Sequence, residues 1–495
     1  MPAFRRHSAP VEASRGAARL VVRELPADLL TPVAAFLALA GPKDDAFLLE
    51  SAAGGEVVGR YSYLGARPRG LLVGEDGLLK SLAPGERADR ATALPGSPLE
   101  ALRGVLERRR APRPEGLPPL TGGLIGYFGW RTSGWVESLP SRLGADLDFP
   151  DALLGEFDDL VAFDNLRGRA LAISAVRVDE HRSAGAALDH ARARCDEMAE
   201  RLGSAGPFAA GARKSAHPRP ARARALGGGR ATFLRSVRRA LEYIRAGDIF
   251  QTVVSQRFEI DDAPDGFAIY RALRGLNPSP YLFYLRLAGR ELIGGSPEAL
   301  ASVRGRELTL RPIAGTRRRG ATPAEDARLA KELAGDPKER AEHVMLVDLA
   351  RNDCGRVSAI GSVRVEELMA LERYSHVMHL VSRVRGTLRE GADLVDAIAA
   401  CFPAGTLSGA PKIRAMEIID ELEPVARGPY GGGAGYLSDA GDLDLAITIR
   451  TLMKHGPRLF AQAGAGIVAD SNPEAEWREV QAKAAAVLRA VELAR

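Results

Sequence analysis

The amino-acid sequence predicts an α+β fold for this chain of 495 residues. Short apolar runs bounded by Gly and Pro turns have the length of strands, and a few longer stretches carry apolar residues at helical spacing. Consecutive short strands joined by tight turns favour an antiparallel sheet over alternating βαβ units. Hydrophobic residues make up 46% and charged residues 26%, as in a typical globular protein. The length calls for two domains or one large composite fold.

The first part of the chain is expected to contain strands and to end with a long helix. Residues 1–18 are basic but lack the apolar segment of a signal peptide, so we interpret them as a flexible tail. Residues 19–202 form the N-terminal region. Its strand candidates are Ala46–Glu50 and Leu171–Val178, and a helical stretch at Ala186–Leu202 ends it.

A basic linker is expected at residues 203–230. Seven Lys or Arg and no Asp or Glu occur from Arg201 to Arg230, in a stretch rich in Ala, Pro and Gly. A nucleic-acid-binding patch is the alternative interpretation. Because Phe208 is the only aromatic residue there and the net charge of +5 is mild, we expect a solvated linker and no nucleic-acid partner.

Hydropathy and cysteine usage indicate where the protein works. The sequence contains no run near 18 consecutive apolar residues, so we expect no membrane span and no membrane partner. Cys195, Cys354 and Cys401 are an odd number without CxxC spacing. We therefore expect neither disulfides nor a zinc site, and a location in the reducing cytoplasm.

The remaining part, residues 231–495, begins with an amphipathic helix predicted at Ala231–Ala246. Strand candidates follow as consecutive short runs, which again favours antiparallel pairing. They are Thr252–Ile260, Tyr281–Leu287, Glu291–Gly294 and Glu307–Arg311.

Two predicted helices in this part carry acidic stripes. Asp336-Pro337 suits a helix start, and Glu339 and Glu342 then share one face. Near the C-terminus, the segment 470–473 (DSNP) is a second capped start, followed by a stripe of Glu476, Glu479 and Lys483. Each stripe could be an exposed face, with Glu479 and Lys483 as an ion pair. If the helices instead face each other, four carboxylates would suit Mg²⁺.

Two Gly-rich segments, Tyr430–Tyr436 and Ala463–Asp470, flank an apolar strand predicted at Ala446–Thr451. The second superficially fits a dinucleotide-binding pattern, but no clear βαβ unit follows it and the next helix cap comes only after the glycines. The glycines are better explained by close approach of backbone N–H groups to an anion. Arg450 on the predicted strand is either a structural cation or a carboxylate clamp.

Taken together, ordered blocks of sequence resemble the chorismate-utilising enzymes typified by anthranilate synthase component I. The resemblance is dense over about residues 231–490 and thinner before them. The blocks are Ala246–Phe258, Asn277–Leu285, Gly294–Leu300, Arg311–Gly320, Asp336–Arg356, Tyr374–Gly386, Pro403–Ile419, Tyr430–Tyr436 and Gly464–Lys483. It implies antiparallel sheets packed face to face with helices outside, and a chain that converts chorismate and ammonia to anthranilate and pyruvate.

The resemblance also implies a set of site residues. Mg²⁺ would be bound by Glu342 and Glu479, supported by Glu339 and Glu476. Chorismate, a dianion, would be bound by Gly315, Thr316, Tyr430, Arg450, Gly464, Gly466 and Lys483. The catalytic residues would be Glu298, His379 and Thr406. Without the family, His379 in its apolar run would be interpreted as a core histidine.

Three positions indicate which chemistry within the family this chain performs. Gln251 replaces the lysine base of the water-adding members, and a glutamine cannot take a proton. Ala314 replaces the lysine nucleophile of many aminodeoxychorismate synthases. Glu298 would protonate the departing C4 hydroxyl while free ammonia attacks C2, which requires a raised pKa of its carboxyl group.

Ammonia needs a source, and the sequence shows no GxCxGxQ-like glutaminase signature. The implied partner is a separate glutamine amidotransferase subunit in a hetero-oligomer. The resemblance further implies feedback inhibition by tryptophan, bound by Leu49, Ser51, Pro280, Tyr281 and Tyr436.

Two alternatives stay open at this point. An aminase that stops at aminodeoxyisochorismate would share most of these residues, whereas an aminodeoxychorismate synthase is disfavoured by Ala314. A non-catalytic chorismate or tryptophan sensor would bind without turnover, which the set of Glu298, four carboxylates and Lys483 argues against.

Overall fold

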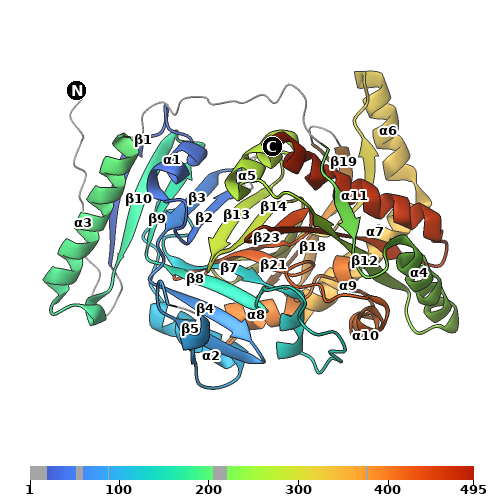
Figure 1. Ribbon diagram of the computed structural model, residues 1–495, viewed down its shortest axis with the longest axis horizontal. Coiled ribbons are helices and arrows are strands. Elements are labelled where there is room, and N and C mark those ends of the chain that lie inside the picture. Colours follow the sequence, from blue (N-terminus) through green and yellow to red (C-terminus); the bar gives the residue numbers. More distant parts are fainter. Residues whose placement is uncertain (1–18, 52–58, 87, 205–219, 375–376) are drawn as a thin grey trace.

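The computed structural model describes residues 19–51, 59–86, 88–204, 220–374 and 377–495. The predicted tail at 1–18 and residues 205–219 of the predicted linker lie outside the described residues. Two twelve-stranded sheets, in which every named pairing of strands is antiparallel, account for the strands of the described chain (Figure 1). The α+β class is confirmed.

The first sheet joins strands from both halves of the sequence. In spatial order they are β1 (Arg19–Pro26), β10 (Arg169–Val176), β9 (Asp159–Asp164), β3 (Tyr61–Ala66), β2 (Ala46–Glu50), β13 (Tyr281–Leu287), β14 (Arg290–Ser296), β23 (Thr451–His455), β24 (Arg458–Ile467), β12 (Gln251–Ile260) and β11 (Ala223–Ala225), with β20 (Gly409–Ala410) paired to β12. β11 lies within the predicted linker.

The second sheet is assembled in the same way. Its order is β17 (Ile313–Arg318), β19 (Val377–Thr387), β16 (Glu307–Leu310), β15 (Ala299–Arg304), β22 (Leu443–Ile447), β21 (Gly433–Ser438), β7 (Gly123–Phe128), β8 (Ala152–Phe157), β4 (Gly70–Glu75), β5 (Leu78–Leu82) and β6 (Thr92–Ala93), with β18 (Arg364–Arg373) paired to β19. The basic segment thus separates the halves in sequence, while both halves contribute to each sheet.

The central core lies between the two sheets. Phe47 and Phe283 of the first sheet share one buried cluster with Ile125 and Phe157 of the second. The Phe47 and Phe157 rings meet edge to face with centroids 4.7 Å apart. The sheets therefore pack face to face through their apolar faces.

Helices cover the outer faces of both sheets (Figure 1). The first sheet is packed by α1 (Pro32–Leu39), α3 (Ala184–Gly203), α5 (Gly266–Leu276) and α11 (Pro473–Ala494), and α4 (Gly229–Ala246) packs beside α11. Against the second lie α2 (Pro98–Arg109), α6 (Pro323–Gly335), α7 (Pro337–Gly355) and α8 (Leu394–Cys401), whereas α9 (Gly405–Ser408) and α10 (Lys412–Leu422) contact β12 of the first sheet. None of the helices of the described chain is long and apolar enough to cross a membrane.

The starts of the two acidic helices are confirmed. Asp336 caps α7 by accepting from the N–H groups of Lys338 and Glu339. Asn472 caps α11 in the same manner, and a proline follows each cap. Both helices begin there because the cap satisfies N–H groups that have no partner within the helix.

The predicted strand at Ala446–Thr451 is wrong. β22 ends at Ile447 in the second sheet, and β23 begins at Thr451 in the first. Between them Arg450 has φ +49°, a left-handed conformation that interrupts a strand. The apolar run therefore crosses from one sheet to the other.

Candidate active site

A cavity of about 160 Å³ lies where the chain crosses between the sheets, and it brings together most of the residues predicted to act on the substrate. The predicted residues that line it are Glu298, Thr406, Tyr430, Arg450, Gly464, Gly466 and Lys483. They come from the turn after β14, from α9, from the loop before β21, from the β22–β23 crossing, from β24 and from α11.

Two glycines of β24 line one wall of the cavity, where they leave space for neighbouring side chains. A Cβ atom on Gly464 would lie 2.8 Å from the Tyr430 hydroxyl, and one on Gly466 would lie 2.7 Å from Nε2 of Gln251. Both distances are shorter than real Cβ contacts, so a larger residue at either position would displace the Tyr430 ring or the amide end of Gln251.

Two cations face the cavity. Lys483 Nζ donates to the Gly464 carbonyl at 2.9 Å and pairs with Glu479 at 2.7 Å. Arg450 is half-buried, and this partial burial lowers its pKa. Within the described residues its guanidinium has no hydrogen-bond or ion-pair partner. A partly buried cation without a protein partner is suited to bind an anionic ligand group.

Glu298 is the acid of the cavity. Its side chain is only 9% exposed, and Thr406 Oγ1 donates to its Oε1 at 3.0 Å. Burial raises the pKa of Glu298 to about 7, although the Thr406 hydrogen bond and the charge of Lys483 lower it. Close to neutral pH a large fraction of Glu298 is therefore protonated and can donate a proton.

His379, Thr316 and Gly315 form a second cluster beside the cavity. Nδ1 of His379 lies 3.0 Å from both the Thr316 hydroxyl and the Gly315 carbonyl. Burial, with a smaller effect from the charge of Arg450, lowers the pKa of His379, so the ring is neutral at pH 7. Since Gly315 O can only accept, Nδ1 carries the proton when that bond forms, and Nε2 is left as an acceptor.

The acidic stripes of α7 and α11 lie within electrostatic reach of each other. Burial raises the pKa of Glu342, and the charges of Glu339 and Glu479 raise it further. Burial and the charge of Glu479 likewise raise the pKa of Glu476, against a hydrogen bond from Ser471. The structure thus brings together carboxylates from two helices whose proximity the spacing alone left open.

The oxygen donors of these carboxylates suit a hard dication, but two of the four are paired with cations in this arrangement. Arg317 donates to Glu339 at 2.8 Å, and Lys483 pairs with Glu479. Across the described ranges, no group of three or more His, Cys, Asp or Glu side chains is placed to bind a metal ion. The carboxylate oxygens are therefore suitable ligands for Mg²⁺, but the four carboxylates do not converge on one position in this structure.

The predicted inhibitor residues gather between the sheets. β2 pairs with β13 so that Leu49 lies opposite Phe283, which brings Ser51 towards Tyr281. Burial raises the pKa of Tyr281, and the neighbouring Tyr436 contributes to that shift. The buried Ser51 hydroxyl has no hydrogen-bond partner within the described chain, so this region has an unused polar group.

Several residues of these sites were not anticipated from the sequence. Val253, Ile449 and Gln462 line the substrate cavity. Gln462 precedes Gly464 by two positions on β24, so the period of two along a strand could have identified it. Arg304 lies over the ring of Tyr436 and comes from a distant strand without a sequence signal.

Comparison with known proteins shows which family the chain resembles. The family model described as chorismate binding enzyme matches residues 65–489. The chain is 45% identical to the anthranilate synthase component 1 of Cereibacter sphaeroides over 481 residues, which are 96% of this chain and 95% of that protein. It is 47% identical to that of Thermus thermophilus over 471 residues, 94% and 96% of the two chains. The crystal structure of anthranilate synthase component I from Streptococcus pneumoniae TIGR4 matches with a TM-score of 0.77 at 34% identity, covering 94% of this chain and 99% of that one.

Proposed function

Since this chain belongs to the family of chorismate-binding enzymes, and within it to the anthranilate synthase component 1 group, we propose that the cavity between Glu298 and Arg450 is where chorismate is aminated and aromatised. The enzyme is a lyase of the anthranilate synthase type. The single observation that carries the assignment of the site is a buried acid of pKa about 7 in the same cavity as a half-buried guanidinium without a partner among the described residues.

Binding of chorismate follows from its two carboxylates. Arg450 and the Tyr430 hydroxyl hold the enolpyruvyl carboxylate. Burial raises the pKa of Tyr430, which keeps its O–H as a donor. Lys483 and the backbone of Gly464 and Gly466 hold the ring carboxylate. Opposite charges and oriented donors are needed because a dianion is desolvated in this cavity.

The reaction proceeds by proton transfer from Glu298. Its carboxyl group protonates the C4 oxygen, the C4–O bond breaks and water leaves, while ammonia attacks C2 and the ring double bonds shift. The added nitrogen loses a proton, so the net products of this step are an amine and water. Loss of the C2 proton and elimination of pyruvate then give anthranilate. Thr406 orients Glu298, and neutral His379 orients the C4 side and assists the elimination.

We propose that Mg²⁺ is required, bound by Glu342 and Glu479 with support from Glu339 and Glu476. When bound, the ion fixes the ring carboxylate and stabilises charge that develops on it. Lys483, which now pairs with Glu479, would be free to contact the substrate once Glu479 is engaged elsewhere. Arg317 holds Glu339 in position at the start of α7.

The ammonia is proposed to come from a separate glutamine amidotransferase subunit, so that the working enzyme is a hetero-oligomer. The three cysteines of the chain are buried and free. Burial raises the pKa of the Cys195, Cys354 and Cys401 thiols, which makes them poor nucleophiles for glutamine hydrolysis. Free thiols also suit the reducing cytoplasm, where we expect the enzyme to act.

We further propose that tryptophan inhibits the enzyme at the cluster of Leu49, Ser51, Pro280, Tyr281 and Tyr436. Tyr436 lies on β21, six residues after Tyr430 of the substrate cavity. Tryptophan would inhibit only if it binds better to a conformation in which Tyr430 is displaced, since a ligand shifts an equilibrium by its differential affinity.

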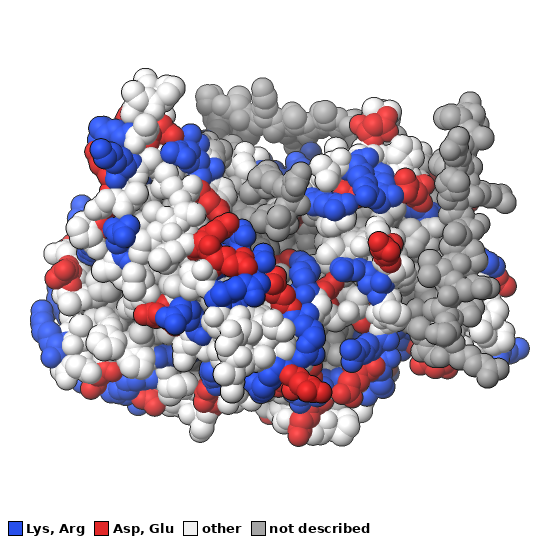
Figure 2. Space-filling model, turned by 180° about the vertical axis from the view of Figure 1, so that it is seen from behind, with Lys and Arg blue, Asp and Glu red and all other residues white. Residues whose placement is uncertain are grey.

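A nucleic-acid-binding role finds no support from the visible surface. On the face seen in Figure 2, the described Lys and Arg side chains lie among Asp and Glu side chains and do not form one large basic field. Residues 205–219 of the basic linker lie outside the described residues.

The test is the nitrogen-donor requirement of the purified chain. With chorismate and Mg²⁺, ammonium salts should give anthranilate, glutamine alone should not, and tryptophan should inhibit the ammonium-dependent reaction. Product formed from glutamine by this chain alone would overturn the partner proposal. Chorismate consumed without anthranilate would show an aminase that stops earlier.

A further inference from the structure

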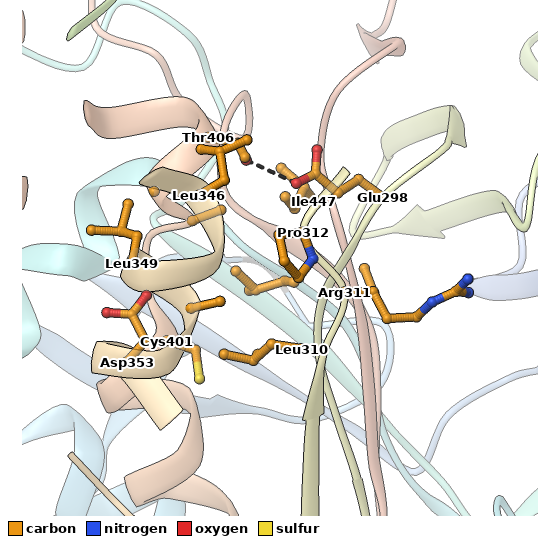
Figure 3. Close-up of a pocket in the computed structure, with 15 residues that line it drawn as sticks. Glu298, Leu310, Arg311, Pro312, Leu346, Leu349, Asp353, Cys401, Thr406 and Ile447 are labelled. Atoms are coloured by element: carbon orange, nitrogen blue, oxygen red, sulfur yellow. Dashed lines mark hydrogen bonds between the residues drawn. The ribbon is translucent and has the colours of Figure 1, made fainter. Parts of the chain in front are cut away.

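A second cavity adjoins the substrate cavity at Glu298, and Figure 3 shows the residues that line it. Its volume is about 50 Å³, which is too small for a substrate with a six-membered ring but holds several water molecules. Glu298 and Thr406 belong to the linings of both cavities, so this pair forms the wall between them.

The walls of this second cavity are apolar, and its ends are polar. Glu298 and Thr406 lie at one end, and Asp353 and Cys401 lie at the other (Figure 3). Leu346, Leu349 and Ile447 lie between them, Leu310 lies at the end of Cys401, and the Arg311 side chain turns away. The residues of α7 follow helical spacing, with Leu346, Leu349, Ala350 and Asp353 on one face. One stripe of α7 therefore connects the two ends.

Asp353 is an unusual group at this position. It is 4% exposed, and Lys412 Nζ donates to its Oδ2 at 2.8 Å. Its Oδ1 is buried and has no hydrogen-bond partner among the described residues. A buried carboxylate oxygen without a hydrogen bond is destabilising, so it needs a donor that the described residues do not supply. A water molecule in the cavity is such a donor.

The proposed reaction suggests a role for the second cavity. This inference rests on Glu298 being the acid of that reaction. Each turnover transfers one proton from Glu298 to the C4 oxygen and releases one water molecule next to it. Glu298 is then a carboxylate and must regain a proton before the next turnover. The substrate covers its other side.

We propose that the second cavity is a water chamber that receives the departing water and returns a proton to Glu298, with Asp353 as the residue that positions the water. The protons balance, because the nitrogen that attacks as ammonia gives up one proton on becoming an amine. That proton restores the one lost by Glu298, through solvent and the chamber.

The charged neighbours of the two ends are few. Lys483 is the charged group that acts on Glu298. Lys412 and Arg356 act on Asp353, whose pKa is raised mainly by burial and lowered by these two cations.

Two variants and one control test the chamber. Asp353→Asn keeps the size of the side chain and removes the carboxylate, and Ala350→Leu fills the chamber without touching the pair of Asp353 and Lys412. Asp348→Asn, on the exposed face of the same helix where Asp348 pairs with Arg351, is the matched control. Thermal unfolding identifies a variant that fails to fold. If one of the two variants fails, the kinetics of the other variant test the proposal.

The readouts are kcat and its solvent deuterium isotope effect, at saturating chorismate and ammonium. Because a positioned proton transfer contributes about 10²–10⁴ in rate, we expect kcat to fall at least about tenfold in both variants, with KM for chorismate nearly unchanged. The isotope effect should rise as proton return becomes rate-limiting, and the control should match the unmodified protein.

A loss of kcat with an unchanged isotope effect would mean that Asp353 is merely structural, and would overturn the proposal, as would no loss at all. The proposed function fails separately. If Glu298→Gln retains activity, Glu298 is not the acid. If Glu298→Gln is inactive while both chamber variants behave like the control, only the chamber proposal is wrong.

Discussion

The hydrogen bond from Thr406 to Glu298 sets the pH range in which the enzyme works. Replacing Thr406 with Val keeps the shape of the side chain and removes the hydroxyl that donates to Oε1 at 3.0 Å. This bond stabilises the carboxylate form and lowers the pKa of Glu298 against the larger effect of burial. Its loss should therefore raise the pKa of Glu298 above 7.

The magnitude follows from the strength of such bonds. A hydrogen bond to a charged group is worth about 1.5–3 kcal/mol, and part of it persists when the carboxyl is neutral. A net difference of about 1.4 kcal/mol corresponds to a pKa about one unit higher. At pH 8 the protonated fraction of Glu298 would then rise from about a tenth to about a half.

The assay is kcat/KM for chorismate as a function of pH, followed by anthranilate fluorescence at a constant concentration of free ammonia. The unmodified protein should lose activity as pH rises through about 7, because Glu298 must be protonated, and the variant should lose it about one unit higher. The absolute rate of the variant will be lower, since Thr406 also orients the acid. A descending limb that stays in place, or that moves to lower pH, would refute the assignment.

Other variants test the remaining parts of the site. Glu298→Gln should lower kcat by about 10²–10⁴. The same variant should raise the free energy of unfolding in urea at pH 8 by up to about 3 kcal/mol. Folding raises the pKa of the Glu298 carboxyl from 4.5 to about 7, so the stability of the unmodified protein is full below pH 4.5 and is lost as pH rises through 7. Equal stability of the two proteins at pH 8 would contradict the burial argument. Arg450→Lys should lower kcat/KM for chorismate by about tenfold to a hundredfold through loss of about 1.5–3 kcal/mol of paired hydrogen bonding, whereas unchanged kinetics would exclude Arg450 as the clamp. Chelation of divalent ions should abolish turnover, and Glu342→Gln should raise the Mg²⁺ concentration needed to restore it; full activity in excess chelator would exclude the metal.

Local sequence signals predicted local structure well. Asp336 and the segment 470–473 contain the residues that cap a helix, and both helices begin there. Apolar runs such as Tyr281–Leu287 became strands with the predicted bounds. Such features could be predicted because capping and strand patterning depend on residues a few positions apart.

Features that depend on the whole fold were missed. The run at Ala446–Thr451 alternates like one strand, but its ends belong to different sheets, and only the packing of those sheets places Arg450 in a left-handed turn. The spacing of acidic residues around Glu342 on one helix and around Glu479 on the other was compatible with two exposed faces as well as with a shared cleft. The second cavity joins α7, α9 and β15, so no local pattern could indicate it.

The most direct test of the account is the product balance of the purified chain and its Glu298→Gln variant, supplied with chorismate, ammonium and Mg²⁺. The account predicts one anthranilate and one pyruvate for each chorismate consumed, and almost none from the variant, which should still bind chorismate. Equal turnover by the variant, or chorismate consumed without pyruvate, would contradict it.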